Sequence, residues 1–486
     1  MASTTAPETP FRVVIVGAGL AGLAASHCLQ RAGIDHVVLE KRTDIAPQLG
    51  ASIAIFPNGA RILHQIGCLR ALEDSCVPLD RWWSRGPDGK AIINNSFFAF
   101  VKENHGQDIL LLERRQLLQT LYDYLPDKSR LRVGCEVKTI KQDKDGVEVI
   151  LADGTVEKGD MVLGADGVRS PVRSMMWEHA NKKTPGFITA EEKRKSMKTS
   201  FKVLLGMGPP ASEVGERDMT ICSDSRFVLT TVSQPTHLFF CVYQKLEKDL
   251  FWPRQPRYTT EDMEALAESV ADHPVSDTIV FGELWKKRNR AILINLEEGV
   301  LQHWHHDRIA LVGDSVHKML PNIGLGGNMA LESVVVLCNH LHSMLMSQQG
   351  KKPDLETLNK ALAAYQEERM PRVLRITDFS TQVAEGQAWV TPLHKFYTKW
   401  LLPLLKDRVL ADMIADLMRG APKLAYVGSS GFGKGTVQWD DEKEDEEKDV
   451  TGKSSLQWAI RIAALVGMVA VGTTQYGRVR SLLGIR

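Results

Sequence analysis

The pattern of apolar and polar positions predicts a βαβ unit near the start of the chain. The apolar run VVIV (13–16) is followed by GAGLAG (17–22), a helical stretch that ends at Gly33, and a second run, HVVLE (36–40). Short apolar runs on both sides of a helical stretch are typical of buried parallel strands. We therefore expect an α/β fold with a parallel sheet.

Later segments predict that this first domain is interrupted by a second one. FKVLLGM (201–207), FVLTTV (227–232) and HLFFCVYQ (237–244) have the composition of strands in a mixed sheet, whereas IALV (309–312) returns to the buried parallel pattern. The expected parts are a first domain over 11–183 that resumes over 286–350, an inserted sheet domain over 184–285 with contributions from about 80–110, a helical region over 351–425 and a flexible acidic linker over 426–455.

The last apolar run, LQWAIRIAALVGMVAVGTT (456–474), has nearly the length needed to span a bilayer. Arg461 interrupts it, so a buried C-terminal helix is the alternative. The acidic linker before it favours a single-pass C-terminal membrane helix. Basic residues on its two sides are balanced and predict no orientation.

Composition narrows the class of protein. Lys and Arg number 60 against 59 Asp and Glu, so no basic field exists to attract nucleic acid. The seven cysteines are scattered and never spaced as CxxC, which argues against disulfides and zinc. The histidines of HWHHD (303–307) lack a further ligand at helical spacing, so no metal is expected. The N-terminus lacks a secretory signal, and we expect the main body to face the cytosol, with the endoplasmic reticulum as the membrane.

The glycine-rich turn indicates a dinucleotide site. Gly17 permits a tight turn, Gly19 lets the backbone approach a pyrophosphate, and Gly22 allows close helix packing. Glu40 follows at the end of the second strand, where a carboxylate can accept hydrogen bonds from a ribose diol. An acid there predicts FAD or NAD, and the basic pair that follows leaves NADP as an alternative.

A second loop, GDSVHKMLPNIGLGGN (313–328), is suited to the other end of such a cofactor. Asp314 follows a buried strand and can accept hydrogen bonds from ribityl hydroxyls. A helix that starts between Gly324 and Asn328 would direct its N-terminal amides at the flavin N1 and O2 edge. His317 is interpreted as a hydrogen-bonded turn residue, with an acid or base role as the alternative.

A third motif, GADGVRSPVR (164–173), places Asp166 in a turn after a strand and two arginines beyond it. This loop could serve the pyrophosphate of FAD or of a transient nicotinamide cofactor. A plain surface loop is the alternative.

The three motifs, in this order, resemble the class A flavoprotein monooxygenases, the group typified by para-hydroxybenzoate hydroxylase. GASIAIFPNGARIL (50–63), LLERRQLLQTLY (111–122) and FGELWKKR (281–288) resemble, within that group, the fungal FAD-dependent epoxidases of meroterpenoid and indole-diterpene pathways. The resemblance implies a Rossmann-like FAD-binding domain with an inserted substrate domain. It also implies FAD contacts at Glu40, Ala54, Arg114, Asp314 and Gly327.

The resemblance further implies what the protein does. NADPH would bind transiently and reduce FAD, dioxygen would form a flavin 4a-hydroperoxide, and an alkene of a prenylated small molecule would be epoxidised. A tyrosine often used by such enzymes falls near Cys222, so no catalytic side chain is assigned. An aromatic-ring hydroxylase on the same scaffold and a cofactor-free protein that binds prenylated partners are the alternatives. The sequence predicts no oligomeric state.

Overall fold

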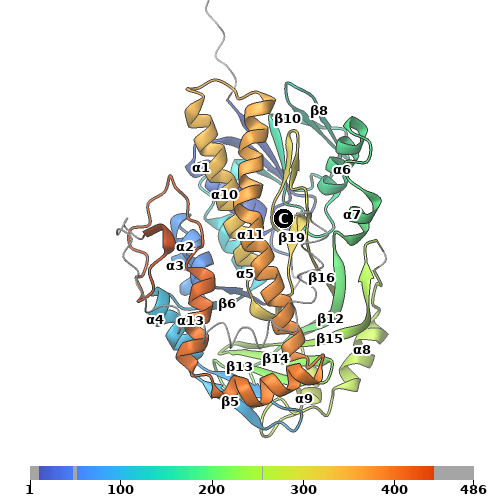
Figure 1. The fold of residues 1–486 in the computed structure, drawn as a ribbon, viewed down its shortest axis with the longest axis vertical. Coiled ribbons are helices and arrows are strands. Elements are labelled where there is room, and N and C mark those ends of the chain that lie inside the picture. Colours follow the sequence, from blue (N-terminus) through green and yellow to red (C-terminus); the bar gives the residue numbers. More distant parts are fainter. Residues whose placement is uncertain (1–9, 48–51, 254, 443–486) are drawn as a thin grey trace, which may run out of the picture.

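A computed structural model describes residues 10–47, 52–253 and 255–442, which form two sheet layers joined by long helices (Figure 1). The helices are α1 (Leu20–Arg31), α2 (Pro57–Gln65), α3 (Leu69–Glu73), α4 (Phe97–His105), α5 (Arg114–Asp123), α6 (Pro171–Lys183), α7 (Ala190–Lys195), α8 (Thr260–Ser269), α9 (Phe281–Lys286), α10 (Gly326–Ser347), α11 (Leu355–Gln387), α12 (Pro392–Phe396) and α13 (Asp407–Met418). The strands of the two large sheets are β1 (Arg12–Val16), β2 (Asp35–Leu39), β4 (Trp82–Arg85), β5 (Ala91–Asn95), β7 (Leu131–Arg132), β11 (Met161–Gly164), β12 (Lys198–Gly208), β13 (Met219–Asp224), β14 (Phe227–Gln234), β15 (His237–Phe251), β16 (Arg290–Val300), β17 (His305–His306), β18 (Ile309–Leu311) and β19 (His317–Lys318).

The first layer is a six-stranded sheet in the order β17-β18-β11-β1-β2-β7. All neighbouring pairs except β17 with β18 are parallel. The expected βαβ unit is confirmed, with α1 between β1 and β2 and the apolar side chains of both strands fully buried. The carboxyl ends of β1, β2, β11 and β18 therefore lie along one edge, where α/β sheets hold their ligands.

The second layer is an eight-stranded sheet in the order β19-β16-β12-β15-β14-β13-β4-β5. Its pairs are antiparallel except β13 with β4. The predicted contribution from about 80–110 is present as β4 and β5. The sheet also takes β16, which lies beyond the expected boundary at 285, because residues 290–298 pair along almost the whole of β12.

Two smaller sheets complete the first layer. β3 (Ser52–Ile55) pairs antiparallel with β6 (Leu110–Glu113). The other sheet has the order β10-β9-β8 and is formed by β8 (Val137–Gln142), β9 (Val147–Leu151) and β10 (Val156–Gly159).

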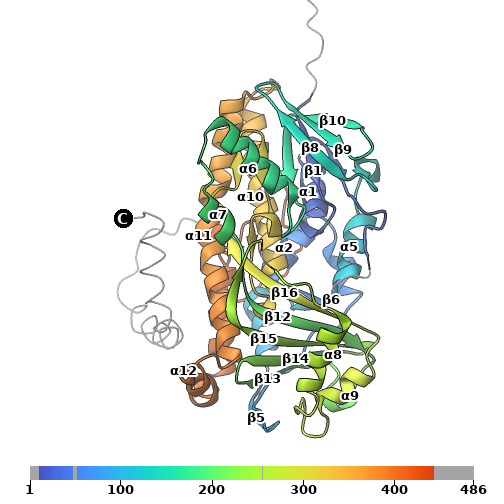
Figure 2. The same cartoon turned by 90° about the vertical axis from the view of Figure 1, so that its right-hand side faces the viewer.

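Helix α11 runs alongside both layers, and α10 lies between it and α1 beside the first layer (Figure 2). Within the described residues, α10 alone has the length and hydropathy of a membrane span, and most of it is buried inside the protein. It packs against α1, α2 and α11, so it is a core helix. The expected membrane helix over 456–474 lies outside the described residues.

The described end of the chain differs from the flexible linker expected over 426–455. Trp439 is only 4% exposed and packs under the Arg61 guanidinium, which lies 4.6 Å from the ring centroid. Arg61 also pairs with Asp441 at 2.9 Å and with Glu442 at 2.7 Å. The composition of this segment is that of a linker. However, Arg61, 380 residues upstream, is buried, and its charge is compensated by the carboxylates of the segment. Residues 426–442 therefore belong to the folded body.

Candidate cofactor and substrate site

The glycine-rich turn leaves open space at the N-terminus of α1. Gly17 has φ +101°, and a Cβ on Gly22 would lie 1.8 Å from the Gly17 carbonyl oxygen, so both positions are required by the protein's own packing. A Cβ on Gly19 would meet no atom within 4 Å. The backbone is thus accessible where the amides of α1 begin, which fits a pyrophosphate.

Glu40 lies beside this turn, at the carboxyl end of β2. Its Oε2 accepts a hydrogen bond from the Ala18 backbone N–H at 2.8 Å, and its Oε1 accepts one from the Arg42 N–H at 2.9 Å. The carboxylate is fixed in position, and each oxygen retains capacity to accept a further hydrogen bond. This arrangement fits the predicted contact with a ribose diol.

The Asp314 loop lies against the first turns of both α1 and α10. A Cβ on Gly313 would lie 3.1 Å from Ala21 Cβ and 3.4 Å from Ala330 Cβ. The Asp314 carboxylate is half-exposed, and the Lys318 ammonium is 3.7 Å from it. Two motifs about three hundred residues apart therefore converge, and the half-exposed Asp314 carboxylate, beside Lys318, retains capacity to accept hydrogen bonds from hydroxyl groups.

Ala54 and Gly327 meet at the N-terminus of α10, which begins at Gly326 as predicted. A Cβ on Gly324 would lie 3.0 Å from Ala54 Cβ, and a Cβ on Gly327 would lie 2.7 Å from Ile53 Cδ1. Strand β3 is therefore packed directly on the start of the helix. Its contacts explain why Gly stands at 327, since a larger residue would displace Ile53.

Asn328 holds this junction together and was not singled out as a site residue from the sequence. Its Nδ2 donates to the Ala54 carbonyl at 2.9 Å and to the Gly324 carbonyl at 3.0 Å, while its Oδ1 accepts from the Phe56 N–H at 3.0 Å. The amide thus joins β3 to the helix start. Only its place in the LGGN motif, directly after Gly327, signalled it.

Arg114 stands at the start of α5, directly after β6. The register of β3 with β6 pairs Ser52 with Glu113 and Ala54 with Leu111, so Arg114 lies one residue beyond the ladder that carries Ala54. Its side chain is exposed. Arg114 therefore follows the strand pair that carries Ala54, and its contact with FAD stays a prediction.

Asp166 lies against the glycine-rich turn but also serves the protein's own structure. Its Oδ2 accepts the Val172 N–H at 2.9 Å and caps the start of α6. Burial raises the pKa of this carboxyl. Its Oδ1 is buried and has no hydrogen-bond partner among the described residues. The Asp166 Cα lies beside Gly17, and an unpaired buried oxygen on this residue fits a site completed by a ligand hydroxyl.

Arg173 joins the GADG loop to the Asp314 loop. Its guanidinium donates to the Ser315 carbonyl at 2.9 Å and to the Val168 carbonyl at 2.7 Å. Ser315 Oγ in turn donates to the Gly164 carbonyl at 2.7 Å. The sequence suggested phosphate binding for the arginines of this motif, and the structure assigns Arg173 to holding two loops together.

A buried ionic network supports α10 from behind. Glu332 is fully buried and accepts hydrogen bonds from Arg369 at 2.9 Å, from Arg372 at 2.7 Å and from Asn58 at 2.7 Å. Burial alone would raise the pKa of Glu332, but Arg372 and Arg369 lower it to about 2. The network fixes the helix whose N-terminus faces the cofactor site.

His317 belongs to the same interior, which supports the interpretation of a hydrogen-bonded turn residue. Its Nε2 lies 2.7 Å from Ser333 Oγ, and its ring packs against Trp304. Burial, together with the neighbouring Arg369, lowers the pKa of His317 to about 3. The ring is therefore neutral at physiological pH and faces away from solvent.

The large sheet presents two rows of side chains toward the cofactor layer, and we call them the apolar floor. Val232 and Phe239 of the floor pack into the same apolar core as the parallel sheet, and Ile221 and Cys241 pack with Leu320 of the Asp314 loop. Across neighbouring strands, the first row consists of Ile292, Leu205, Cys241, Thr230 and Ile221. The second row consists of Arg290, Met207, Phe239, Val232, Met219 and Trp82.

Several floor residues are only partly buried, which leaves apolar surface for a ligand. Ile292 is 40% exposed, and Leu205, Met207 and Met219 are half-buried. The single charge in the two rows, Arg290, is paired with Glu113. Cys222 lies on the opposite face of the sheet, buried under α8 and α9. A side chain at position 222 therefore cannot act at the cofactor.

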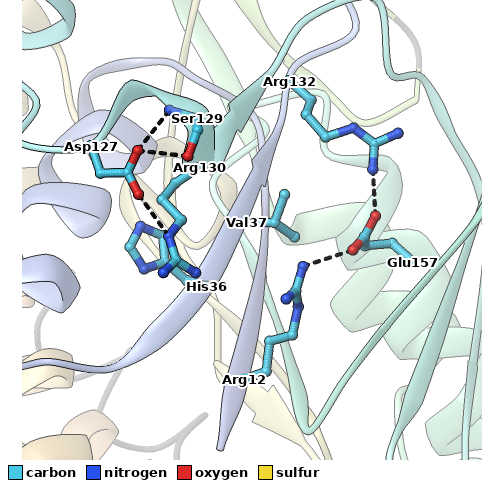
Figure 3. A pocket seen from close by; sticks show the side chains of 8 residues that line it. All are labelled: Arg12, His36, Val37, Asp127, Ser129, Arg130, Arg132 and Glu157. Atoms are coloured by element: carbon cyan, nitrogen blue, oxygen red, sulfur yellow. Dashed lines mark hydrogen bonds and ion pairs between the residues drawn. The ribbon is translucent and has the colours of Figure 1, made fainter. Parts of the chain in front are cut away.

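A separate cavity of about 260 Å³ lies at the opposite, amino-terminal edge of the parallel sheet (Figure 3). Arg12 pairs there with Asp35 at 3.1 Å and with Glu157 at 2.8 Å, and the remaining arginines of the lining are paired as well. Because the charged side chains that line this cavity pair with one another, it is poorly suited to a charged ligand. We therefore assign cofactor binding to the carboxyl-terminal edge of the parallel sheet.

Comparisons with known proteins agree with this geometry. Residues 10–380 match the family model described as FAD binding domain. The chain is 41% identical over 437 residues to FAD-dependent monooxygenase DEP2 of Alternaria brassicicola, covering 89% of this chain and 82% of that protein. It is 37% identical to FAD-dependent monooxygenase ptmM of Penicillium ochrochloron, covering 86% and 98%.

The fold is also similar to solved structures. Klebsiella pneumoniae HpxO complexed with FAD and uric acid superposes with a TM-score of 0.68 at 20% identity, covering 85% of this chain and 97% of that one. An HpxO variant complexed with FAD gives a TM-score of 0.69. At this identity the likeness shows a shared fold.

Proposed function

Since the chain belongs to the FAD-binding-domain family of FAD-dependent monooxygenases, we propose that it epoxidises an alkene of a prenyl chain. The substrate is an intermediate of the fungal meroterpenoid or indole-diterpene class. One oxygen atom of dioxygen enters the alkene and the other leaves as water, while NADPH supplies the two electrons and a proton from solvent completes the balance.

The observation that carries this proposal is the apolar floor. An alkene has no group to deprotonate and needs a surface that orients it and excludes water. Leu205 and Met219 pack in one apolar cluster with Leu320 of the Asp314 loop, and Ile292 and Met207 continue this surface in the same two rows. The relatives named above are fungal FAD-dependent monooxygenases, which supports the reaction class from which this proposal starts.

Bound FAD would supply the activated oxygen. The residues of this chain would hold and polarise it: Glu40 would accept hydrogen bonds from the adenosine ribose, Asp314 would accept them from the ribityl chain, and the amides at the start of α10 would stabilise negative charge on the ring edge. Asn328 and the Glu332 network keep that helix start in position. No side chain of the floor is required to transfer a proton.

The test is product formation from a panel of prenylated aromatic compounds. Purified protein, NADPH and ¹⁸O₂ should give a product that has gained one labelled oxygen atom, and acid hydrolysis should convert this epoxide to a diol. A phenol labelled on the aromatic ring would instead show a ring hydroxylase on the same scaffold. A colourless protein that binds the prenylated compounds without NADPH oxidation would show a binding protein and overturn the proposal.

We also propose that residues 456–474 anchor the chain in a membrane, with the catalytic body in the cytosol and the endoplasmic reticulum as the location. The pairing of Arg61 with Asp441 and Glu442 makes Glu442 the natural end of a shortened chain. The complete chain should resist extraction with alkaline carbonate, which removes proteins docked only at the membrane surface, whereas a chain that ends at Glu442 should be released. Release of both would contradict the anchor.

A further inference from the structure

The segment that follows α11 exposes an unusual amount of apolar surface. Of the eleven large apolar side chains exposed in the described part of the chain, five lie within twelve consecutive positions. They are Leu393 (49% exposed), Phe396 (51%), Trp400 (61%), Leu401 (41%) and Leu404 (75%). Exposed apolar residues concentrated in this way mark an interaction surface.

The segment is amphipathic, and its other face is docked on the protein. Helical turns continue from α12 through residues 397–404. Tyr397 and Thr398 are buried, and Thr398 Oγ1 donates to the Gly386 carbonyl at 3.2 Å. Positions 393, 396, 400 and 404 recur at helical spacing and therefore share the exposed side. The orientation of this surface is thus fixed by packing.

The charged residues around this apolar surface indicate which partner it binds. From 386 to 406 the sequence has no Asp or Glu, while Lys395, Lys399 and Lys406 are exposed around the apolar surface. The acids at the two ends of this stretch are already engaged, because Glu385 pairs with Lys245 and Asp407 accepts the Ser96 N–H. An apolar surface that carries Trp and Phe and is bordered by lysines is complementary to an anionic lipid interface.

We propose that residues 392–406 form a membrane-docking surface, which inserts Phe396, Trp400 and Leu404 among the lipids while the lysines contact anionic headgroups. Figure 2 shows α12 at the lower end of α11, at the margin of the molecule beside the large sheet. This places the surface where a flat bilayer can reach it. The inference is independent of the anchor at 456–474 and of the reaction.

Two other occupants fit less well. A second copy of the chain related by a twofold axis would bring the same lysines face to face, which is unfavourable. The C-terminal acidic stretch of the same chain offers opposite charge, but its first carboxylates, Asp441 and Glu442, are held by Arg61 and Lys423. Both are outcomes of the test below.

The test uses the complete chain bound to phosphatidylcholine vesicles, with and without phosphatidylserine, that contain a photoreactive phospholipid. After illumination, mass spectrometry locates the cross-linked peptides. We expect lipid adducts on residues 392–406. The double variant Trp400→Ser/Leu404→Ser should lower them by at least about tenfold. The triple variant Lys395→Gln/Lys399→Gln/Lys406→Gln should lower them by about fivefold per lysine, only in vesicles with phosphatidylserine.

Met346→Ser is the matched control, because this apolar side chain is 62% exposed on α10, far along the chain from the docking surface. It should leave the adducts on 392–406 unchanged. Adducts confined to residues after 442, cross-links between 392–406 and the C-terminal stretch, or protection of 392–406 by a second copy would each overturn the proposal.

Discussion

Asn328 and Ala54 are 274 residues apart in the chain, yet the Asn328 side-chain amide donates to the Ala54 carbonyl at 2.9 Å. The same amide accepts the Phe56 N–H at 3.0 Å. One side chain therefore sets the position of β3 against the start of α10, where the cofactor ring is expected to lie.

Replacing Asn328 with Ala should loosen this junction. A buried carbonyl and a buried N–H lose their partner, which should destabilise the fold by about 2 kcal/mol and weaken FAD binding by about tenfold. FAD titration followed by fluorescence measures the effect. Asn339→Ala is the control, because Asn339 also makes two backbone hydrogen bonds from α10, to Lys423 and Ala425. Equal loss of FAD affinity in both variants would contradict the assignment.

Gly19 and Gly22 should separate cofactor binding from folding. Gly19→Ala meets no protein atom within 4 Å, so it should fold normally but bind FAD at least about tenfold more weakly, because its Cβ enters the pyrophosphate space. Gly22→Ala places a Cβ 1.8 Å from a carbonyl oxygen and should cost about 3 kcal/mol or more of folding stability. Thermal unfolding without FAD, followed by FAD titration, distinguishes the two effects.

Asp314→Ala should yield a colourless protein. The half-exposed carboxylate is the acceptor that the ribityl hydroxyls would use, and its loss should cost about 1 to 3 kcal/mol of cofactor binding. The absorbance of the purified protein near the flavin bands measures occupancy. Asp153→Ala, which removes a carboxylate from the turn before β10, should remain yellow. Full flavin content in Asp314→Ala would remove this role.

Leu205→Gln should impair use of an apolar substrate without affecting FAD. The side chain lies at the centre of the apolar floor, so a polar amide there should lower kcat/KM by about tenfold. Flavin content and the rate of NADPH oxidation without substrate should be unchanged. Ile150→Gln, at a half-buried position on β9, serves as the matched control. An unchanged kcat/KM for Leu205→Gln would place the substrate elsewhere.

His317 should make folding stability depend on pH. Its pKa is about 3 in the folded protein and 6.5 as a free side chain, so the unfolded chain binds more protons between these values. The contribution of neutral His317 to the free energy of unfolding is complete above about pH 6.5 and is lost as the pH falls toward 3. Over this range the free energy of unfolding should fall by up to about 1.4 kcal/mol per pH unit.

The free energy of unfolding, measured between about pH 6 and pH 4, tests this dependence. His317→Gln should show a smaller slope than the unchanged protein. Ser333→Ala removes the hydrogen-bond partner but keeps the imidazole, so it should lower stability while retaining the slope. Identical slopes in all three proteins would contradict the prediction.

Local pattern was sufficient to predict the elements that carry the cofactor motifs. The βαβ unit and the start of α10 have strong apolar periodicity and glycines at turns, which depend on neighbours in the sequence. Glu40, Asp314, Ala54 and Gly327 could be placed because each lies in such a motif, and the structure brings them to one edge of the sheet.

Features that depend on distant partners could not be predicted in the same way. Asn328 acts through backbone groups on β3, and the segment 426–442 is held by Arg61, whose burial has no local signal. β16 follows the predicted domain boundary but completes the large sheet, because its partner β12 lies about ninety residues earlier. In each case tertiary packing overrides local composition.

Helix α11 makes the two layers a single mechanical unit. Arg369 on this helix binds Glu332 behind the cofactor site, while Ser380 and Thr381 bond to Leu320 and Glu298 and Ala384 packs on the large sheet. A hinge rotation of one layer against the other would break the contacts of α11 with at least one of them. Substrate must therefore enter by local displacement of loops and side chains around a rigid frame.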